Sequence, residues 1–432
     1  MILQELYDNY TAILAEELVP AMGCTEPIAI AYASAKACSV LAEDFRHIHV
    51  SCSGNIIKNV KGVIVPNSGG QKGIEAAAIL GAVGGNPDKA LEVIAGADDE
   101  ARSLTRKLVR QGLCSVSLAE NVPNLYIEVT ASGQEHTASV RIENHHTDIT
   151  RIAIDSTTIY EHERQESEST AKTADRSMMK LSTILEYADT VKLDDIREIL
   201  ERQIYCNTKI SQEGLDNKWG ACVGKTIIET WGNDVRSCAC ARAAAGSDAR
   251  MSGCPMPVII NSGSGNQGIT VSLPVIEYAE KWRISREKLY RCLTVSNLVS
   301  IYIKKFIGSL SAFCGAVSAS AGAGAGITYM AGGDYASIGR TITNTLANVG
   351  GIVCDGAKPS CAAKIASSVN AALLAHYMSM NDDEFRGGEG FVEDDVEQTI
   401  RNMGYIGKIG MKDTDKEILN VMIDRVDVAS CV

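Results

Sequence analysis

Segments with the character of β-strands are concentrated in one part of this chain, apart from an extended stretch at 257–261. They are recognised by β-branched content and alternation, and they lie at 47–53, 62–66, 125–131, 136–143 and 148–155. Helical patterns near 70–82 and 88–110 separate some of these segments. Turn residues between the later strands favour antiparallel pairing. Residues 46–160 are therefore predicted to form a small α/β domain that contains a mixed or antiparallel sheet.

The chain on either side of this region has helical patterns. A chain of 432 residues is too long for one ordinary core, so more than one domain is expected. Pro20 divides the first 45 residues into two helices, and a polar stretch rich in Ser and Thr follows residue 160. The predicted fold class is α+β, with a mostly helical domain beside the smaller α/β domain. The predicted parts are N-terminal helices (1–45), the α/β domain (46–160), a linker (161–177) and the helical domain (178–432).

Composition argues against several kinds of partner. The net charge of −12 disfavours binding to nucleic acid or to an anionic membrane surface. The uncharged run at 306–333 is rich in Gly, Ala and Ser, which is typical of a tightly packed buried helix and not of a membrane span. The N-terminal residues lack the basic start of a signal peptide, so a cytoplasmic protein is expected. Small side chains on the helix faces are compatible with a homodimer.

Three cysteines near the C-terminal end are the most specific candidate ligands. Cys314, Cys354 and Cys361 are separated by 39 and six residues, and they lie among Gly, Ala and Ser. Small residues let the backbone come close to a bulky inorganic group. Three thiolates can bind three irons of a 4Fe–4S cluster and leave the fourth iron open as a Lewis acid. Most of the other cysteines are expected to be buried small residues, because disulfides are rare in the cytoplasm.

A fourth cysteine, Cys24, lies just before a helix that begins near Glu26 and Pro27. The N–H groups and the dipole at a helix N-terminus lower the pKa of a thiol, which favours a reactive cysteine there. A buried and inert cysteine is the alternative. Histidine offers little by comparison, because no zinc-binding motif is present and His145–His146 falls in a polar turn.

Two loops rich in Gly, Ser and Asn are candidates for binding a small anion. The loop at 261–268 fits the pattern GxGxxG, but it lacks the βαβ unit of a dinucleotide site, so a carboxylate suits its N–H groups better. The loop at 67–73 precedes a helix whose N-terminus would attract an anion, and a plain turn with a helix cap is the alternative. The candidate substrate-binding residues are Asn67, Ser68, Asn261, Ser262, Gly263, Ser264, Gly265, Asn266 and Gln267.

With these motifs, the chain resembles the iron–sulfur L-cysteine desulfidase family, a relative of the iron–sulfur L-serine dehydratases. The resemblance covers nearly the whole chain. Its most specific segments are MGCTEP (22–27), NSGSGNQG (261–268), FCGAV (313–317) and GIVCDGAKPSC (351–361). In the serine dehydratases, ten residues instead of six separate the last two cluster cysteines. The shorter gap in this chain favours the desulfidase branch.

The resemblance implies a site and a reaction. Cys314, Cys354 and Cys361 match the cluster-binding positions, and Cys24 matches the cysteine proposed to handle the substrate proton. The implied enzyme is a carbon–sulfur lyase that converts L-cysteine, a small amino-acid substrate, and water into sulfide, pyruvate and ammonia without pyridoxal phosphate. Residues 178–432 would then be the cluster-binding catalytic domain, and residues 1–45 would pack on it so that Cys24 reaches the cluster.

Two other functions stay open at this point. The first is an iron–sulfur L-serine or L-threonine dehydratase, which would release ammonia but no sulfide. The second is a non-catalytic redox sensor whose cluster has a fourth protein ligand. Cys431, next to the C-terminus, is a candidate for that fourth ligand.

Overall fold

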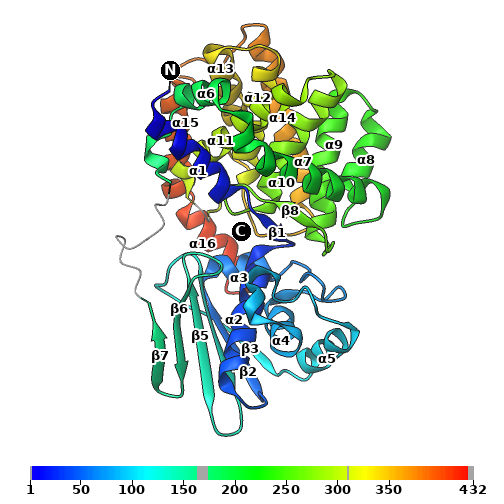
Figure 1. The fold of residues 1–432 in the computed structure, drawn as a ribbon, viewed down its shortest axis with the longest axis vertical. Helices are drawn as coiled ribbons and strands as arrows, with labels where there is room; N and C mark the ends of the chain where they lie inside the picture. Colours follow the sequence, from blue (N-terminus) through cyan, green and yellow to red (C-terminus); the bar gives the residue numbers. More distant parts are fainter. Residues whose placement is uncertain (1, 163–173, 309–310, 427–432) are drawn as a thin grey trace.

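The chain folds into two lobes that lie end to end (Figure 1). The computed structural model describes residues 2–162, 174–308 and 311–426, so Cys431 and most of the expected linker lie outside the described residues. We call residues 24–162 the sheet lobe, and residues 4–22 together with 174–411 the helical lobe. Each lobe has its own hydrophobic core. A sheet in one lobe and helices in the other confirm the predicted α+β class.

The sheet lobe is built on a six-stranded mixed sheet with the strand order β3-β2-β4-β5-β6-β7. Only β2 and β3 pair in parallel, and the other neighbours are antiparallel. In β2 every second residue is buried, so Ile48, Val50 and Cys52 face the core. The strands are β2 (His47–Cys52), β3 (Cys114–Leu118), β4 (Tyr126–Ser132), β5 (Thr137–Glu143), β6 (Ile149–Ile154) and β7 (Thr157–Glu161).

Helices cover one face of this sheet (Figure 1). The central one, α2, packs on β4, β5 and α4, and a Cβ on Gly81 of α4 would lie 2.2 Å from the carbonyl oxygen of Ala31, so the two helices approach closely. We expected residues 1–45 to pack on the helical part, but α2 belongs to the core of the sheet lobe because it is apolar on nearly all sides. The helices are α2 (Thr25–Leu41), α3 (Gly54–Val60), α4 (Gly73–Gly84), η1 (Pro87–Glu92) and α5 (Asp99–Arg110).

Some predicted elements of the sheet lobe differ in the structure. Residues 62–66 do not form a strand, because Val63 and Val65 are buried beneath a turn that makes only an isolated bridge between Ile64 and Lys72. The helix expected at 88–110 is present only from Asp99 onward. The short strands β3 and β7 were not expected.

The helical lobe is an assembly of closely packed helices around α12. A Cβ on Gly322 would lie 2.5 Å from the carbonyl oxygen of Ser296, and one on Gly326 would lie 2.8 Å from that of Cys292, so α12 touches the backbone of α11. The helices are α1 (Gln4–Glu17), η2 (Arg176–Met178), α6 (Leu181–Thr190), α7 (Leu193–Asp216), α8 (Val223–Trp231), α9 (Val235–Met251), α10 (Gly265–Lys281), α11 (Arg286–Ile307), α12 (Gly315–Met330), α13 (Tyr335–Val349), α14 (Cys361–Met380), α15 (Val396–Tyr405) and η3 (Ile406–Gly410). No helix within the described ranges is long and apolar enough to cross a membrane.

The contacts between the lobes include a small sheet and the last helix. A small antiparallel sheet joins β1 (Pro20–Met22), which leads into α2, to β8 (Pro257–Ile259), which leads into the loop at 261–268. The last helix, α16 (Lys412–Met422), returns to the sheet lobe, where Asp415 forms an ion pair with the buried Lys58 of α3. The predicted domain boundaries stay a prediction, but the β1–β8 pairing fixes the start of α2 beside the Gly-rich loop.

His376 of α14 provides a test of the helical core. Its ring is buried, with Nδ1 2.9 Å from Oγ1 of Thr328, and burial lowers its pKa to about 4. The unfolded chain therefore binds more protons between pH 4 and about 6.5, so stability falls as the pH drops through this window. The difference in pKa corresponds to about 3 kcal/mol. We expect the melting temperature of His376→Gln to fall less than that of the wild type between pH 7 and pH 4.5, whereas parallel curves would contradict this role.

Candidate active site

A cavity of about 1560 Å³ lies where the two lobes meet, and residues of both lobes line it. Cys24, Glu26, Asn59 and His146 come from the sheet lobe. The helical lobe contributes, among others, residues of the loop at 261–268, of the ends of α9 and α11, and of the segments that carry the three candidate cluster cysteines. The structure therefore brings Cys24, the Gly-rich loop and the cysteine trio to a single cavity.

Backbone pairing joins the segments that carry Cys314 and Cys354. Phe313 and Val353 form an antiparallel bridge, in which the N–H of Cys314 donates to the carbonyl of Ile352 at 3.0 Å. The N–H of Cys354 donates in the same way to the carbonyl of Ala312 at 2.6 Å. Cys361 begins α14 after a tight loop. The pairing makes residues that are 40 positions apart immediate neighbours.

The charges of the three thiols act on one another. Burial raises the pKa of Cys314 and of Cys361, and the neighbouring Cys354 raises both further. Lys364 acts in the opposite direction on both thiols. Thiols that resist ionisation in this way become thiolates when a cation binds between them.

The chemistry of the donor set suits an iron–sulfur cluster, because thiolates are the usual ligands of its irons. Among the residues that the structure describes, no group of three or more His, Cys, Asp or Glu side chains is arranged to hold a single metal ion. In a 4Fe–4S cluster each thiolate binds a different iron, so the sulfurs surround a larger object than one ion. The three cysteines are free thiols on the wall of a large cavity. Their role as cluster ligands stays a prediction.

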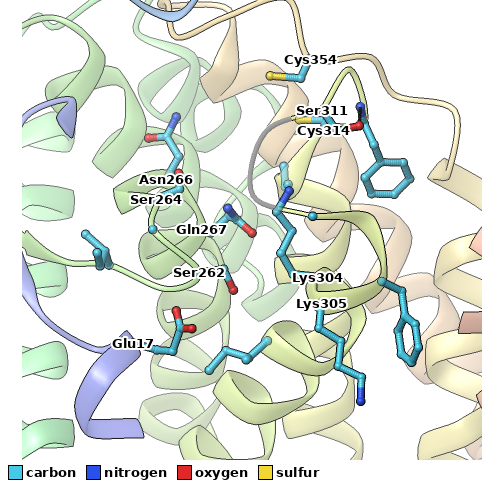
Figure 2. Close-up of a pocket in the computed structure, with 18 of the residues that line it drawn as sticks. Glu17, Ser262, Ser264, Asn266, Gln267, Lys304, Lys305, Ser311, Cys314 and Cys354 are labelled. Atoms are coloured by element: carbon cyan, nitrogen blue, oxygen red, sulfur yellow. Dashed lines mark hydrogen bonds between the residues drawn. The ribbon is translucent and has the colours of Figure 1, made fainter. Parts of the chain in front are cut away.

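Lys304, in the last turn of α11, is a buried lysine in the same wall. Burial lowers its pKa to about 8, although Cys354 and Cys314 act to raise it. Figure 2 shows Lys304 beside Gln267, the residue of the Gly-rich loop whose amide lies against Gly315, next to Cys314. Lys304 was not among the predicted site residues. Helical spacing could have indicated that Lys304 is buried, because Lys304 lies one turn after the buried Ser300.

Cys24 stands at the N-cap of α2 and is buried beside a carboxylate. Its Sγ donates a hydrogen bond to Oε2 of Glu26 at 2.9 Å. Nδ2 of Asn59 donates to the other carboxylate oxygen, Oε1, at 3.0 Å. Burial acts to raise the pKa of Glu26, but His146, the Cys24 thiol and Arg250 hold it below its ordinary value. Glu26 is therefore an ionised acceptor for the proton of the thiol.

The pKa of Cys24 differs from the expectation. A helix N-terminus was expected to lower it, but the pKa is well above its ordinary value, first because the thiol is buried and second because Glu26 is nearby. Arg250 opposes these effects without overcoming them. Loss of water outweighs the helix dipole in a buried position. Cys24 is thus a neutral thiol whose proton points to a carboxylate.

His146 was dismissed from the sequence, yet it also lines the cavity. It lies between β5 and β6 of the sheet lobe, and its Nε2 is buried without a hydrogen-bond partner among the described residues. Burial lowers the pKa of His146, although Glu26 acts to raise it. An imidazole with a free nitrogen is a second group that can exchange a proton here.

The loop at 261–268 divides into two kinds of residue. Ser262, Gly263, Ser264, Asn266 and Gln267 line the cavity as expected of substrate-binding residues. In contrast, Asn261 is fully buried, and its side chain bonds to Asn297, Ser262 and Ser300. Gly265 is the first residue of α10 and does not line the cavity. Asn261 therefore holds the loop in shape, while its neighbours face the ligand space.

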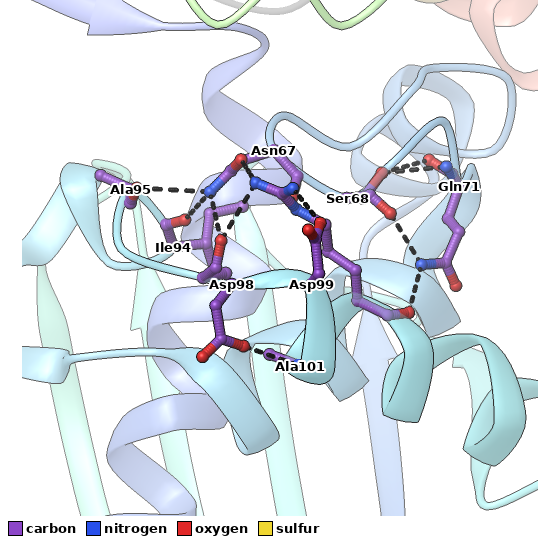
Figure 3. Close-up of polar contacts among 10 residues, drawn as sticks. Asn67, Ser68, Gln71, Ile94, Ala95, Asp98, Asp99 and Ala101 are labelled. Atoms are coloured by element: carbon purple, nitrogen blue, oxygen red, sulfur yellow. Dashed lines mark hydrogen bonds and ion pairs between the residues drawn. The ribbon is translucent and has the colours of Figure 1, made fainter.

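Asn67 and Ser68 lie away from this cavity, and their side chains are used within the sheet lobe (Figure 3). Nδ2 of Asn67 donates to the carbonyls of Ile94, Ala95 and Ala97, and Oδ1 accepts from Arg102. Ser68 exchanges hydrogen bonds with Gln71. These contacts match the alternative of a plain structural turn, so the structure does not bring the two residues together with the rest of the site.

Comparison with known proteins gives the family. The family model described as serine dehydratase alpha chain matches residues 88–420, which include the Gly-rich loop and the cysteine trio. This chain belongs to the serine dehydratase alpha chain family, and the predicted resemblance to the iron–sulfur serine dehydratases is confirmed. Among its relatives are UPF0597 proteins of Desulfitobacterium hafniense and Lachnoclostridium phytofermentans, each 49% identical over 419 residues. The match covers 97% of this chain in both cases, and 97% and 100% of the relatives.

Proposed function

We propose that this chain is a lyase that removes sulfide from L-cysteine by β-elimination, with a 4Fe–4S cluster and without pyridoxal phosphate. Membership of a family named for a dehydratase supports a lyase-type enzyme. The observation that carries the proposal is that the cysteine trio, the Cys24–Glu26 pair and the Gly-rich loop line one cavity. The six-residue gap between Cys354 and Cys361 favours L-cysteine as the substrate.

Cys314, Cys354 and Cys361 would hold the cluster, and when bound it would supply a Lewis-acidic iron for the leaving group. The protein residues around it would control charge. Lys304 is buried close enough to Cys354 and Cys314 for the charges to interact, so its ammonium would offset the charge of the thiolates. The cavity-lining hydroxyl and amide groups of the Gly-rich loop would orient the substrate.

Elimination requires that the α-proton of the substrate is removed. The Cys24–Glu26 pair is suited to this proton transfer. The thiol proton already points to Oε2 of Glu26 at 2.9 Å. As Cys24 takes the α-proton, Glu26 accepts the thiol proton, so no buried thiolate accumulates. The C–S bond of the substrate breaks, and sulfide leaves with the bonding electrons. The aminoacrylate that remains tautomerises and reacts with water to give pyruvate and ammonia.

Dehydration of L-serine or L-threonine is the second candidate function, and the family name favours it. The same proton transfer would apply, with hydroxide instead of sulfide as the leaving group. Sulfide distinguishes the two candidates, because only desulfuration of L-cysteine releases it.

The test is anaerobic purification with quantitation of iron and acid-labile sulfide, followed by assays of 2-oxo acid and sulfide. We expect L-cysteine to give pyruvate and sulfide in equal amounts, and removal of iron by a chelator to abolish both. Turnover of L-serine or L-threonine with little turnover of L-cysteine would select the dehydratase. A bound cluster without turnover of any of the three amino acids would favour the redox sensor.

A further inference from the structure

Arg250 presents a buried positive charge to the cavity with no anionic partner. It lies in the last turn of α9, its side chain is only 3% exposed, and it contributes to the cavity wall. Its Nη1 donates to Oδ1 of Asn266 at 3.2 Å. Its Nε has no hydrogen-bond partner, and no carboxylate forms an ion pair with it, within residues 2–162, 174–308 and 311–426. An unpaired buried guanidinium lowers the stability of the folded protein unless a ligand supplies the negative charge.

The buried carboxylate of Glu26, which feels the charge of Arg250, does not fill this role. Glu26 is close enough for Arg250 to lower its pKa, but its oxygens already accept hydrogen bonds from Cys24, Thr25 and Asn59. Arg250 also acts electrostatically on the Cys24 thiol. Arg250 therefore lines the cavity in a place where its charge acts on both members of the proton-transfer pair.

Groups around Arg250 leave room for a polar ligand in this part of the cavity. A Cβ on Gly265 would lie 2.3 Å from Nε of Arg250, so only glycine at this position lets the start of α10 pack beside the guanidinium. Gln267 is buried, and its Oε1 also has no hydrogen-bond partner among the described residues. Its amide lies against Gly315, the residue after Cys314. Unpaired polar groups thus extend from Arg250 toward the cysteine trio.

We propose that Arg250 binds the α-carboxylate of the amino-acid substrate and that the site requires this group to be free. The inference rests on the proposed elimination and adds the residue that selects the substrate class. A guanidinium and a carboxylate form strong charge-assisted hydrogen bonds of fixed geometry. Because the α-carbon is bonded to the carboxylate, this anchor holds the α-proton near Cys24. The Gln267 amide is placed to bind a polar group on the side that faces Cys314.

Equilibrium binding to the iron-loaded protein tests the proposal without turnover. L-Alanine has the carboxylate but no leaving group, and L-alaninamide is its match without the negative charge. We expect calorimetry to show that the wild type prefers L-alanine. Arg250→Gln should weaken L-alanine binding roughly 10- to 100-fold and abolish the preference, and it should raise KM for L-cysteine. Arg250→Lys should keep part of the preference because it keeps the charge.

Arg236→Gln is the matched control, because Arg236 lies on the same helix but is exposed and outside the cavity. Iron content and melting temperature of each variant show whether it folds. Equal binding of L-alanine and L-alaninamide by the wild type, or no binding of L-alanine, overturns the proposal even if Arg250→Gln does not fold. Unchanged L-alanine binding by a folded Arg250→Gln also overturns it. If L-alanine binding depends on Arg250 but no amino acid undergoes elimination, the role of Arg250 in binding the carboxylate is supported and the proposed reaction is wrong.

Discussion

Replacing Cys354 by serine is expected to remove the iron and the activity together. Cys354 is joined to the Cys314 segment by backbone pairing, so its side chain belongs to the same wall of the cavity. A serine hydroxyl does not ionise near neutral pH and is a poor ligand for iron, so only two thiolates would remain. We expect iron and acid-labile sulfide to fall to background, and pyruvate formation to fall by roughly 100-fold or more.

Cys222→Ser is the control for this variant, because Cys222 is also a half-buried free cysteine but lies outside the cavity. It should keep its iron and its activity. Full iron content in Cys354→Ser would show that Cys354 is not a ligand, and the cluster would then have to be assigned to other residues. Loss of activity with the iron retained would make Cys354 a substrate-contacting residue instead.

The fold could be predicted where the pattern is local. Alternation in β2 and β5 follows from one buried face, and it was readable from the residues alone. The strand β3 was missed because all five of its residues are only half-buried and its partner β2 lies more than 60 residues earlier. The buried run at 62–66 was misread as a strand, since apolar β-branched residues also fill a core from a turn. Helix α2 was assigned to the wrong neighbour, because an apolar helix does not indicate which core it joins.

The candidate site, like the fold, could be predicted from the sequence only in part. The cysteine trio was visible because three thiols among small residues are rare in sequence, and the backbone pairing of Phe313 with Val353 could only be seen in three dimensions. Polar loops look alike in sequence whether their side chains bind a ligand or their own backbone, so Asn67 was proposed as a ligand contact but is used internally. Lys304 and Arg250 belong to no motif, and only burial beside a cavity distinguishes them from surface cations.

Replacing Cys24 by serine is expected to leave the iron in place and remove nearly all elimination. The serine hydroxyl can still donate a hydrogen bond to Glu26, but it is a far poorer base than sulfur at neutral pH. We expect kcat/KM for L-cysteine to fall roughly 100- to 10,000-fold, the range for loss of a general acid–base group. Glu26→Gln should have a comparable effect, because an amide cannot accept the thiol proton.

The control for Cys24→Ser is Cys52→Ser, which makes the same change at a buried cysteine of the sheet lobe outside the cavity. Iron and sulfide quantitation beside the pyruvate assay then separates two roles for Cys24. Iron retained with activity lost fits a proton-transferring residue, because Cys24 is bonded to Glu26 and stands on a different lobe from the trio. Iron lost together with activity would make Cys24 a cluster ligand. The proton transfer would then have to be reassigned, and His146, whose Nε2 is unpaired among the described residues, is the group left to perform it.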